Sequence, residues 1–218
     1  MPDSLDADIA ALAEYSKSCS WLKGYGAVSE IIKMADAKRI LEIGVAYGYH
    51  ALHLLETCPT ISYVGVDPFL ADYDPSDPFA LDVERLFPSQ TTSYNSKNLA
   101  MSRLHRAVEA TIKRKQRNAE VFRETFLAYS RAHSSERFDL IYIDGNHTED
   151  AVFSDIILSL KQISRKGYIC GDDIERDSVR FGLLKAAHLY GLSPRLHTHR
   201  ATGKVLWVLP ANDIEWIR

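Results

Sequence analysis

The chain of 218 residues has few cysteines, no long apolar segment and no strong excess of either charge. Its three cysteines do not have the spacing of a metal site, so we expect reduced thiols. A net charge of −3 gives no general attraction for nucleic acid, which we do not expect as a partner. No apolar run approaches the roughly 20 residues of a membrane span, and the N-terminus lacks the basic and apolar regions of a secretory signal. We therefore expect a cytoplasmic protein without a membrane partner.

Two apolar strands that both end in acids are the most informative part of the sequence. Phe138–Ile143 is a nearly unbroken apolar run, typical of a parallel strand covered on both faces, and Asp144 and His147 follow it. After a helical pattern, the apolar segment Tyr168–Cys170 ends in Gly171–Asp173. Ligands of open α/β sheets bind outside the carboxyl ends of the strands. Three carboxylates and a histidine at that edge can hold a divalent cation and supply a base.

The first third of the chain predicts half of a nucleotide-binding fold. The strand Arg39–Ile43 leads into the glycine loop Gly44–Gly48, a helical pattern follows, and the strand Tyr63–Val66 ends in Asp67. The glycines allow a ligand to approach the backbone, and the acid can accept hydrogen bonds from two ribose hydroxyls.

Glu42, which precedes the glycine loop, distinguishes between nucleotide cofactors. In a dinucleotide enzyme this carboxylate would lie beside a pyrophosphate and repel it, and the G-x-G-x-x-G spacing of such enzymes is missing. An ammonium group suits Glu42 better. S-adenosylmethionine carries an ammonium group and a ribose and has no phosphate, so the sequence favours this cofactor over a nicotinamide dinucleotide.

These patterns together predict the α/β class with one domain over residues 1–218. We expect a Rossmann-like sheet of seven strands, the last of them antiparallel, with helices on both faces. Helical residues 1–37, including a helix over Ser4–Leu22, precede the sheet. An insertion at about 69–117 follows the second strand, and it consists of a loop-rich part, Phe69–Asn95, and an amphipathic helix, Ser96–Arg117.

The chain resembles the class I S-adenosylmethionine-dependent methyltransferases. The resemblance covers roughly Ser29–Leu209, and the segments LEIGVAYGYHAL and VGVDPF carry it. The segments IDGNH and GDD are similar to those of the metal-dependent O-methyltransferases of small molecules. Among these the macrocin and mycinamicin sugar O-methyltransferases are most similar, and catechol O-methyltransferase is more distant.

The resemblance implies a set of site residues and two cofactors, S-adenosyl-L-methionine and Mg²⁺ or a similar divalent cation. His147 would be the general base. The metal ligands would be Asp144, Asp172 and Asp173. The residues that bind S-adenosylmethionine would be Glu42, Gly44, Ala46, Gly48, Asp67, Thr125 and Asp144. The segment Glu124–Thr125 departs from the Gly-x-Ser that the family commonly has, so the adenine contact at Thr125 is the weakest of these expectations.

Each of these interpretations has an alternative that the sequence leaves open. Asp144 can simply cap the next helix, Asp172 and Asp173 can belong to a solvated turn, and His147 can be a surface histidine. The insertion can be a lid or an ordinary surface loop. For the whole protein, the alternatives are a nicotinamide-dependent oxidoreductase and a catalytically silent S-adenosylmethionine-binding protein. The expected partner is a small-molecule acceptor, a sugar or a catechol-like hydroxyl, and a homo-oligomer stays open.

Overall fold

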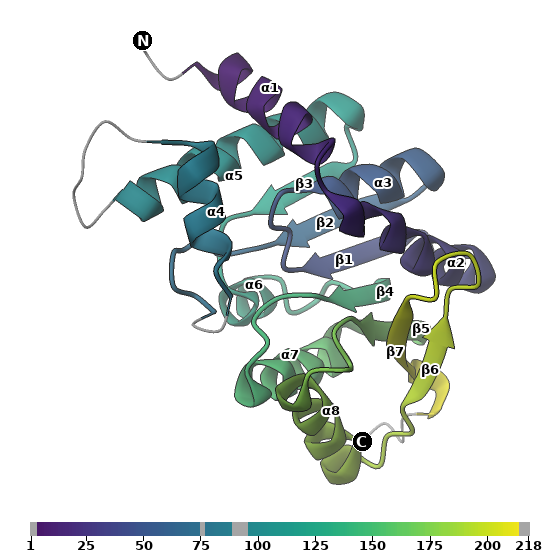
Figure 1. Cartoon of the computed structure of the whole chain (residues 1–218). Coiled ribbons are helices and arrows are strands. Elements are labelled where there is room, and N and C mark those ends of the chain that lie inside the picture. The colour runs from purple at the N-terminus through teal and green to yellow at the C-terminus, as the bar shows by residue number, and fades with distance from the viewer. Residues whose placement is uncertain (1–3, 75–76, 89–95, 214–218) are drawn as a thin grey trace.

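The computed structural model describes residues 4–74, 77–88 and 96–213. Seven strands form one sheet in the order β3-β2-β1-β4-β5-β7-β6 (Figure 1). The strands are β1 (Arg39–Ile43), β2 (Ser62–Val66), β3 (Ala119–Phe122), β4 (Phe138–Ile143), β5 (Ile163–Gly171), β6 (Arg195–Thr198) and β7 (Val205–Pro210). Only β7 runs against its neighbours, because both β5 and β6 pair with it in antiparallel register. The predicted sheet, including its antiparallel last strand, is confirmed.

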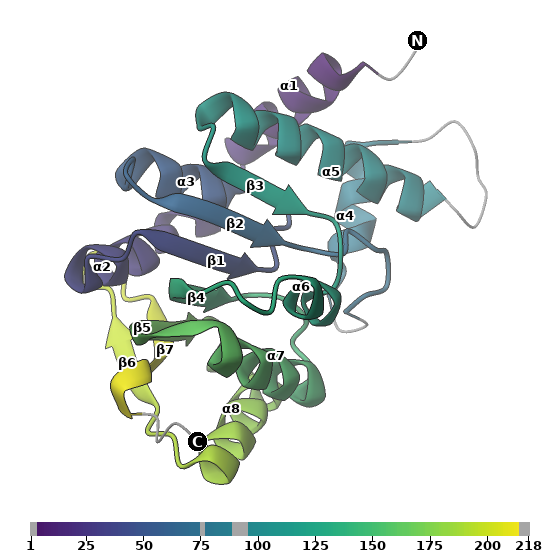
Figure 2. The ribbon, with the colours of Figure 1, turned by 180° about the vertical axis from the view of Figure 1, so that it is seen from behind.

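Helices cover both faces of the sheet, as predicted (Figures 1 and 2). One core cluster joins the sheet to α1 (Leu5–Ser16), α2 (Gly26–Ala35), α3 (Tyr49–Thr57), α4 (Phe79–Leu86) and α5 (Ser96–Lys115). A second cluster, on the other face, joins it to α6 (Phe126–Ala132), α7 (Glu149–Gln162) and α8 (Asp177–Tyr190). The short 3₁₀ helices η1 (Ser20–Tyr25) and η2 (Ala211–Asp213) complete the described elements. Because both faces are buried, the central strands are apolar on both sides.

Three predicted element bounds were wrong, and each error has a local cause. The N-terminal helix ends at Ser16 instead of Leu22, and the hydroxyl groups of Ser16 and Ser18 donate to backbone carbonyls of the last turn. The strand predicted over Tyr168–Cys170 begins earlier, at Ile163, with an irregular pairing to β4.

The third error concerns the insertion, whose first part was predicted to be rich in loops. It contains α4, which follows Pro78 directly and buries Ala80 and Val83. The prolines of this segment suggested a loop, but proline is well tolerated at the start of a helix. Residues 75–76 and 89–95 of the predicted insertion lie outside the described part of the chain.

Candidate active site

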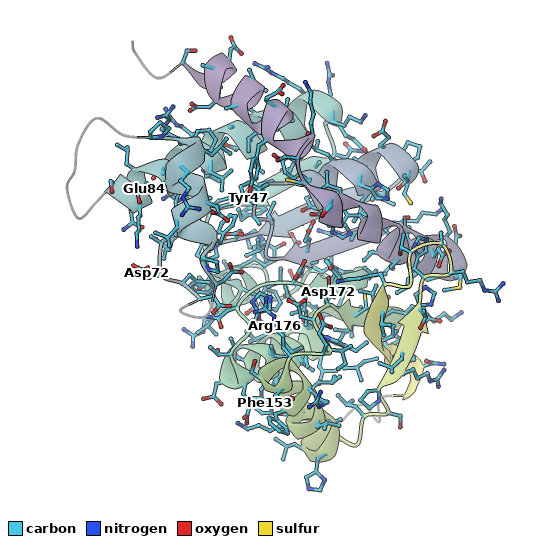
Figure 3. All side chains as sticks on the ribbon, in the orientation of Figure 1. Tyr47, Asp72, Glu84, Phe153, Asp172 and Arg176 are labelled. Atoms are coloured by element: carbon cyan, nitrogen blue, oxygen red, sulfur yellow. The ribbon has the colours of Figure 1, made fainter. Side chains whose placement is uncertain are left out.

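A cavity of about 490 Å³ lies at the carboxyl ends of the central strands. The residues that follow β1, β2, β4 and β5 line it, together with parts of the insertion and of the N-terminal helices. In Figure 3, Asp172 and Arg176 lie near the middle of the molecule, and Tyr47 lies toward α4. Tyr47 contacts Phe79 of α4 edge to face, with ring centroids 4.9 Å apart. The cavity is therefore where the sheet topology predicts a ligand site.

The glycine loop after β1 adopts a backbone that needs glycine at two positions. Gly44 has φ 89°, and a Cβ there would lie 2.0 Å from the backbone oxygen of Asp144. Gly48 has φ 72°, and a Cβ there would lie 2.7 Å from Cγ1 of Val108 in α5. In this structure the two glycines allow a close approach to β4 and α5, whereas the sequence suggested a close approach to a ligand. Gly44 and Ala46 also line the cavity.

Asp67, at the end of β2, is bonded to the glycine loop. Its Oδ2 accepts hydrogen bonds of 2.9 Å from the N–H groups of Val45 and Ala46, and its Oδ1 accepts one of 2.6 Å from Phe69. The side chain is 9% exposed and lines the cavity. Burial raises the pKa of this carboxyl, while the three backbone hydrogen bonds oppose that rise. Asp67 thus holds the loop in place, and the ribose contact stays a prediction.

Glu42 is also occupied by protein partners. Its carboxylate lies 2.9 Å from Nδ1 of His50 and accepts a hydrogen bond of 2.5 Å from the hydroxyl of Tyr63. Glu42 is 1% exposed, although it contributes to the cavity lining. The Nε2 atom of His50 is buried without a hydrogen-bond partner among the described residues. The predicted ammonium contact of Glu42 stays a prediction.

The structure places all three predicted metal-binding acids along the cavity, but the partners of these acids differ in charge. Asp172 lies 2.6 Å from the ammonium group of Lys204, a residue that sequence analysis did not identify. Asp144 has a neutral partner, the hydroxyl of Tyr142 at 3.2 Å. Burial, Asp172 and Asp173 together raise the pKa of Asp144 to about 7.

His147 lies between two carboxylates. Its Nδ1 is 2.7 Å from Asp74 of the insertion, and its Nε2 is 2.8 Å from Asp173, which also contacts Arg176 at 3.3 Å. Burial alone would lower the pKa of His147, but the bonds to Asp173 and Asp74 raise it to about 9. The bond to His147 is in turn the main cause that lowers the pKa of Asp173. In this arrangement His147 is protonated at neutral pH.

The predicted lid is bonded to this part of the site. The backbone oxygen of Tyr73 accepts a 2.6 Å hydrogen bond from Asn146, and Asp74 accepts one of 2.8 Å from the backbone N–H of His147. The insertion therefore contributes a carboxylate to the histidine. Sequence analysis missed the role of Asp74, and the acidic cluster Asp72–Asp74 was the signal that could have indicated it. Whether the segment opens and closes stays a prediction.

Ligand atoms of Asp144, His147 and Asp173 lie within 4.8 Å of one another. Two of the three predicted metal ligands are in this group, and His147 takes the place of Asp172. Carboxylate oxygens and an imidazole nitrogen are both common ligands of divalent ions. The group thus offers a candidate metal site in which His147 is either a ligand or a neighbouring base.

Thr125 and Asp155 occupy positions that sequence analysis did not foresee. Thr125 caps α6 by accepting a hydrogen bond from the N–H of Ala128, and its neighbour Phe126 lines the cavity in its place. Asp155, on α7, also lines the cavity, and burial raises its pKa to about 7. In the sequence Asp155 is separated by four residues from the other acids of its helix, so no local pattern marks it. None of the described helices has the length and hydrophobicity that a membrane span requires.

Comparison with known proteins identifies the family. A family model described as a methyltransferase domain matches residues 41–174, more than half of the chain, so the chain belongs to this family. It is an S-adenosylmethionine-dependent methyltransferase, as predicted, and not the alternative nicotinamide-dependent oxidoreductase. No curated protein sequence matches the chain.

Several solved structures have a similar fold. An O-methyltransferase from Bacillus cereus in complex with SAH is 15% identical, with 96% of this chain and 92% of that chain covered and a TM-score of 0.55. A putative caffeoyl-CoA O-methyltransferase from Staphylococcus aureus is 14% identical, with 93% of this chain and 91% of that chain covered and a TM-score of 0.55. CalS11, a calicheamicin methyltransferase, is 17% identical, with 88% of this chain and 78% of that chain covered and a TM-score of 0.56. At these identities the likeness establishes the shared fold.

Proposed function

We propose that this methyltransferase methylates a hydroxyl group of a small molecule, a sugar or a catechol-like compound, with the help of a divalent cation. The observation that carries the proposal is the group of Asp144, His147 and Asp173, whose ligand atoms lie within 4.8 Å of one another beside the cavity. A hydroxyl oxygen is a weak nucleophile until its proton is removed, and this group offers the means to remove it. The O-methyltransferase activity of the structural neighbours agrees with this proposal.

The residues present fit a divalent cation. Two predicted ligands, Asp144 and Asp173, supply hard oxygen atoms, and Asp144 has no positively charged partner within ion-pair distance among the described residues. The repulsion that contributes to raising the pKa of Asp144 to about 7 would be relieved by a cation. Asp172 can serve as a third ligand if its carboxylate separates from Lys204. A bound cation would act as a Lewis acid that lowers the pKa of the acceptor hydroxyl.

His147 would accept the proton from the acceptor hydroxyl. For this the imidazole must be neutral, and the bonds to Asp173 and Asp74 keep it protonated near pH 7. If Asp173 turns toward a cation, one of the two carboxylates that raise the pKa of His147 is lost, and Nε2 becomes free. Asp74 still orients the ring through Nδ1. The acceptor oxygen then forms a bond to the methyl carbon, while the bonding pair of the breaking S–CH₃ bond stays on the sulfur.

The test is methyl transfer from S-adenosylmethionine to a panel of sugars and catechols, with and without excess chelator. We expect turnover of at least one hydroxyl acceptor, its loss in chelator and its recovery with Mg²⁺. Equal turnover in excess chelator would refute the metal requirement. Methylation of amine or thiol acceptors alone would refute O-methylation.

The third metal ligand can be identified in the same assay. If Asp172 is a ligand, Asp172→Asn should raise the Mg²⁺ concentration needed for half-maximal turnover, while His147→Ala should leave it nearly unchanged and lower kcat. If His147 is a ligand instead, His147→Ala should raise that Mg²⁺ concentration, and Asp172→Asn should leave it nearly unchanged.

A further inference from the structure

One carboxyl group of the cavity has no role in the mechanism above. Asp155 reaches the cavity from α7, and its Oδ2 lies 3.9 Å from the place that a Cβ of Gly145 would take. Within residues 4–74, 77–88 and 96–213 no group makes a hydrogen bond or an ion pair with this carboxyl. Asp155 is partly exposed to the cavity, so its carboxyl has lost part of its hydration, a cost in free energy that a bound ligand with an N–H donor would recover.

The surroundings of Asp155 differ from those of the other cavity acids. Ile43, Val66 and Phe126 belong both to the core cluster on the α6 to α8 face and to the cavity lining. Burial raises the pKa of Asp155, and no charged neighbour contributes to this shift; the pKa of the nearby Tyr73 is raised by burial and by Asp155. Among the described residues, the Asp155 side of the cavity thus combines apolar surface with this carboxyl and the nearby Tyr73, and no cation pairs with Asp155 there.

S-adenosylmethionine has two chemically different ends. The amino-acid end carries charges, whereas adenine is flat and uncharged and presents an exocyclic amino group beside a ring nitrogen. Only adenine matches an apolar wall with one carboxyl on it. The carboxylate can accept a hydrogen bond from the amino group. Because the pKa of Asp155 is about 7, its protonated form can also donate to the ring nitrogen.

We propose that Asp155 binds the exocyclic amino group of the cofactor's adenine, which makes the space between Gly145 and Phe126 the adenine subsite. This inference rests on the use of S-adenosylmethionine by the chain. The proposal also agrees with the position of Thr125, whose side chain caps α6, because the contact with adenine does not require it. Asp155 acts in cofactor recognition and takes no part in the methyl transfer itself.

The test is calorimetric binding of two probes, S-adenosylhomocysteine and its analogue that lacks the 6-amino group. We expect the wild-type protein to prefer S-adenosylhomocysteine by about 10-fold or more. Asp155→Ala and the similarly sized Asp155→Leu should bring the ratio of the two dissociation constants close to one. Asp155→Asn should keep a preference, because an amide can accept from the amino group and donate to the ring nitrogen.

Asp150→Ala is the matched control, because Asp150 lies on the same helix with its side chain 91% exposed. It should leave the ratio unchanged. An unchanged ratio in Asp155→Ala and Asp155→Leu, with or without an equal weakening of both probes, would overturn the proposal, as would equal binding of both probes by the wild type. Should Asp155→Ala fail to fold, the ratio in Asp155→Leu decides. If the wild type binds neither probe, it is the use of S-adenosylmethionine that fails.

Discussion

The two sides of the cavity hold their acidic groups in opposite ways. On the polar side, Asp172 pairs with Lys204, and Asp173 pairs with His147 and Arg176. On the apolar side, Asp155 has no such partner among the described residues. A ligand of Asp172 or Asp173 must therefore replace an existing ion pair, whereas a ligand of Asp155 needs only to supply a donor. The polar side is suited to a step that moves a proton, and the apolar side to recognition.

The largest expected effect that would test this comparison is on catalysis at His147. His147→Ala should lower kcat by roughly 10²–10⁴-fold, the usual contribution of a general base. S-adenosylhomocysteine should still bind if its adenine occupies the proposed subsite on the apolar side. The measurement is steady-state kinetics together with calorimetry.

His188→Ala serves as the control, since His188 lies on α8 and does not line the cavity. If His147→Ala methylates its acceptor at the wild-type rate, His147 is not the base. The histidine would then only hold the insertion through Asp74.

The next effect concerns Gly44, which lies where the two sides of the cavity meet. In Gly44→Ala the new Cβ would lie 2.0 Å from the backbone oxygen of Asp144, at φ 89°. Both the clash and the positive φ oppose the substitution, so the free energy of unfolding should fall by more than about 3 kcal/mol. Gly191→Ala is the matched control, because Gly191 has φ 63° and nothing within 4 Å. Gly191→Ala should lower the free energy of unfolding by only about 1–2 kcal/mol. If urea unfolding shows equal losses for the two variants, the steric argument is contradicted.

Much of the fold and part of the site could be predicted from the sequence. Apolar strands followed by acids mark the edge of a parallel sheet, so Asp67, Asp144 and Asp172 could be placed at the cavity in advance. The partners that distant segments supply to the site residues could not be predicted in this way. Lys204 lies in the turn between β6 and β7, where no local pattern indicates its contact. Asp74 lies in the acidic cluster of the insertion, which indicates a polar segment but does not identify His147 as its partner. Glu42 shows the same limit, because only the fold reveals that His50 and Tyr63 occupy its carboxylate.

A third effect tests whether Asp67 belongs to the site or only to the scaffold. Asp67→Ala removes the acceptor of three backbone N–H groups, so the free energy of unfolding should fall by roughly 1–3 kcal/mol. If the carboxylate also binds the ribose, the affinity for S-adenosylmethionine should fall by roughly 1.5–3 kcal/mol. Calorimetry and urea unfolding measure the two losses separately.

Asp139 provides the matched control for Asp67. Its Oδ2 accepts 3.0 Å hydrogen bonds from the N–H groups of Lys38 and Arg39, at the opposite end of β1 and β4 from the cavity. Asp139→Ala should therefore lower stability without weakening cofactor binding. If Asp67→Ala does the same, the ribose contact is refuted and Asp67 serves the loop alone.

The smallest expected effect is the pH dependence of stability that His147 confers. Its pKa is about 9 in the folded protein and about 6.5 in an unfolded chain. A pKa that is raised by folding means that the protonated histidine stabilises the fold. This contribution is complete below about pH 6.5 and is lost as the pH rises through 9.

Between pH 7 and 9, in chelator, wild type should lose about 1–2 kcal/mol more stability than His147→Ala does. Urea unfolding at several pH values measures this difference and cancels the titration of Asp155, which both proteins share. A difference that stays constant from pH 6 to 9 would show that the bonds to Asp74 and Asp173 do not hold a protonated imidazole. His147 would then be neutral in the resting enzyme and could accept a proton without first leaving Asp173.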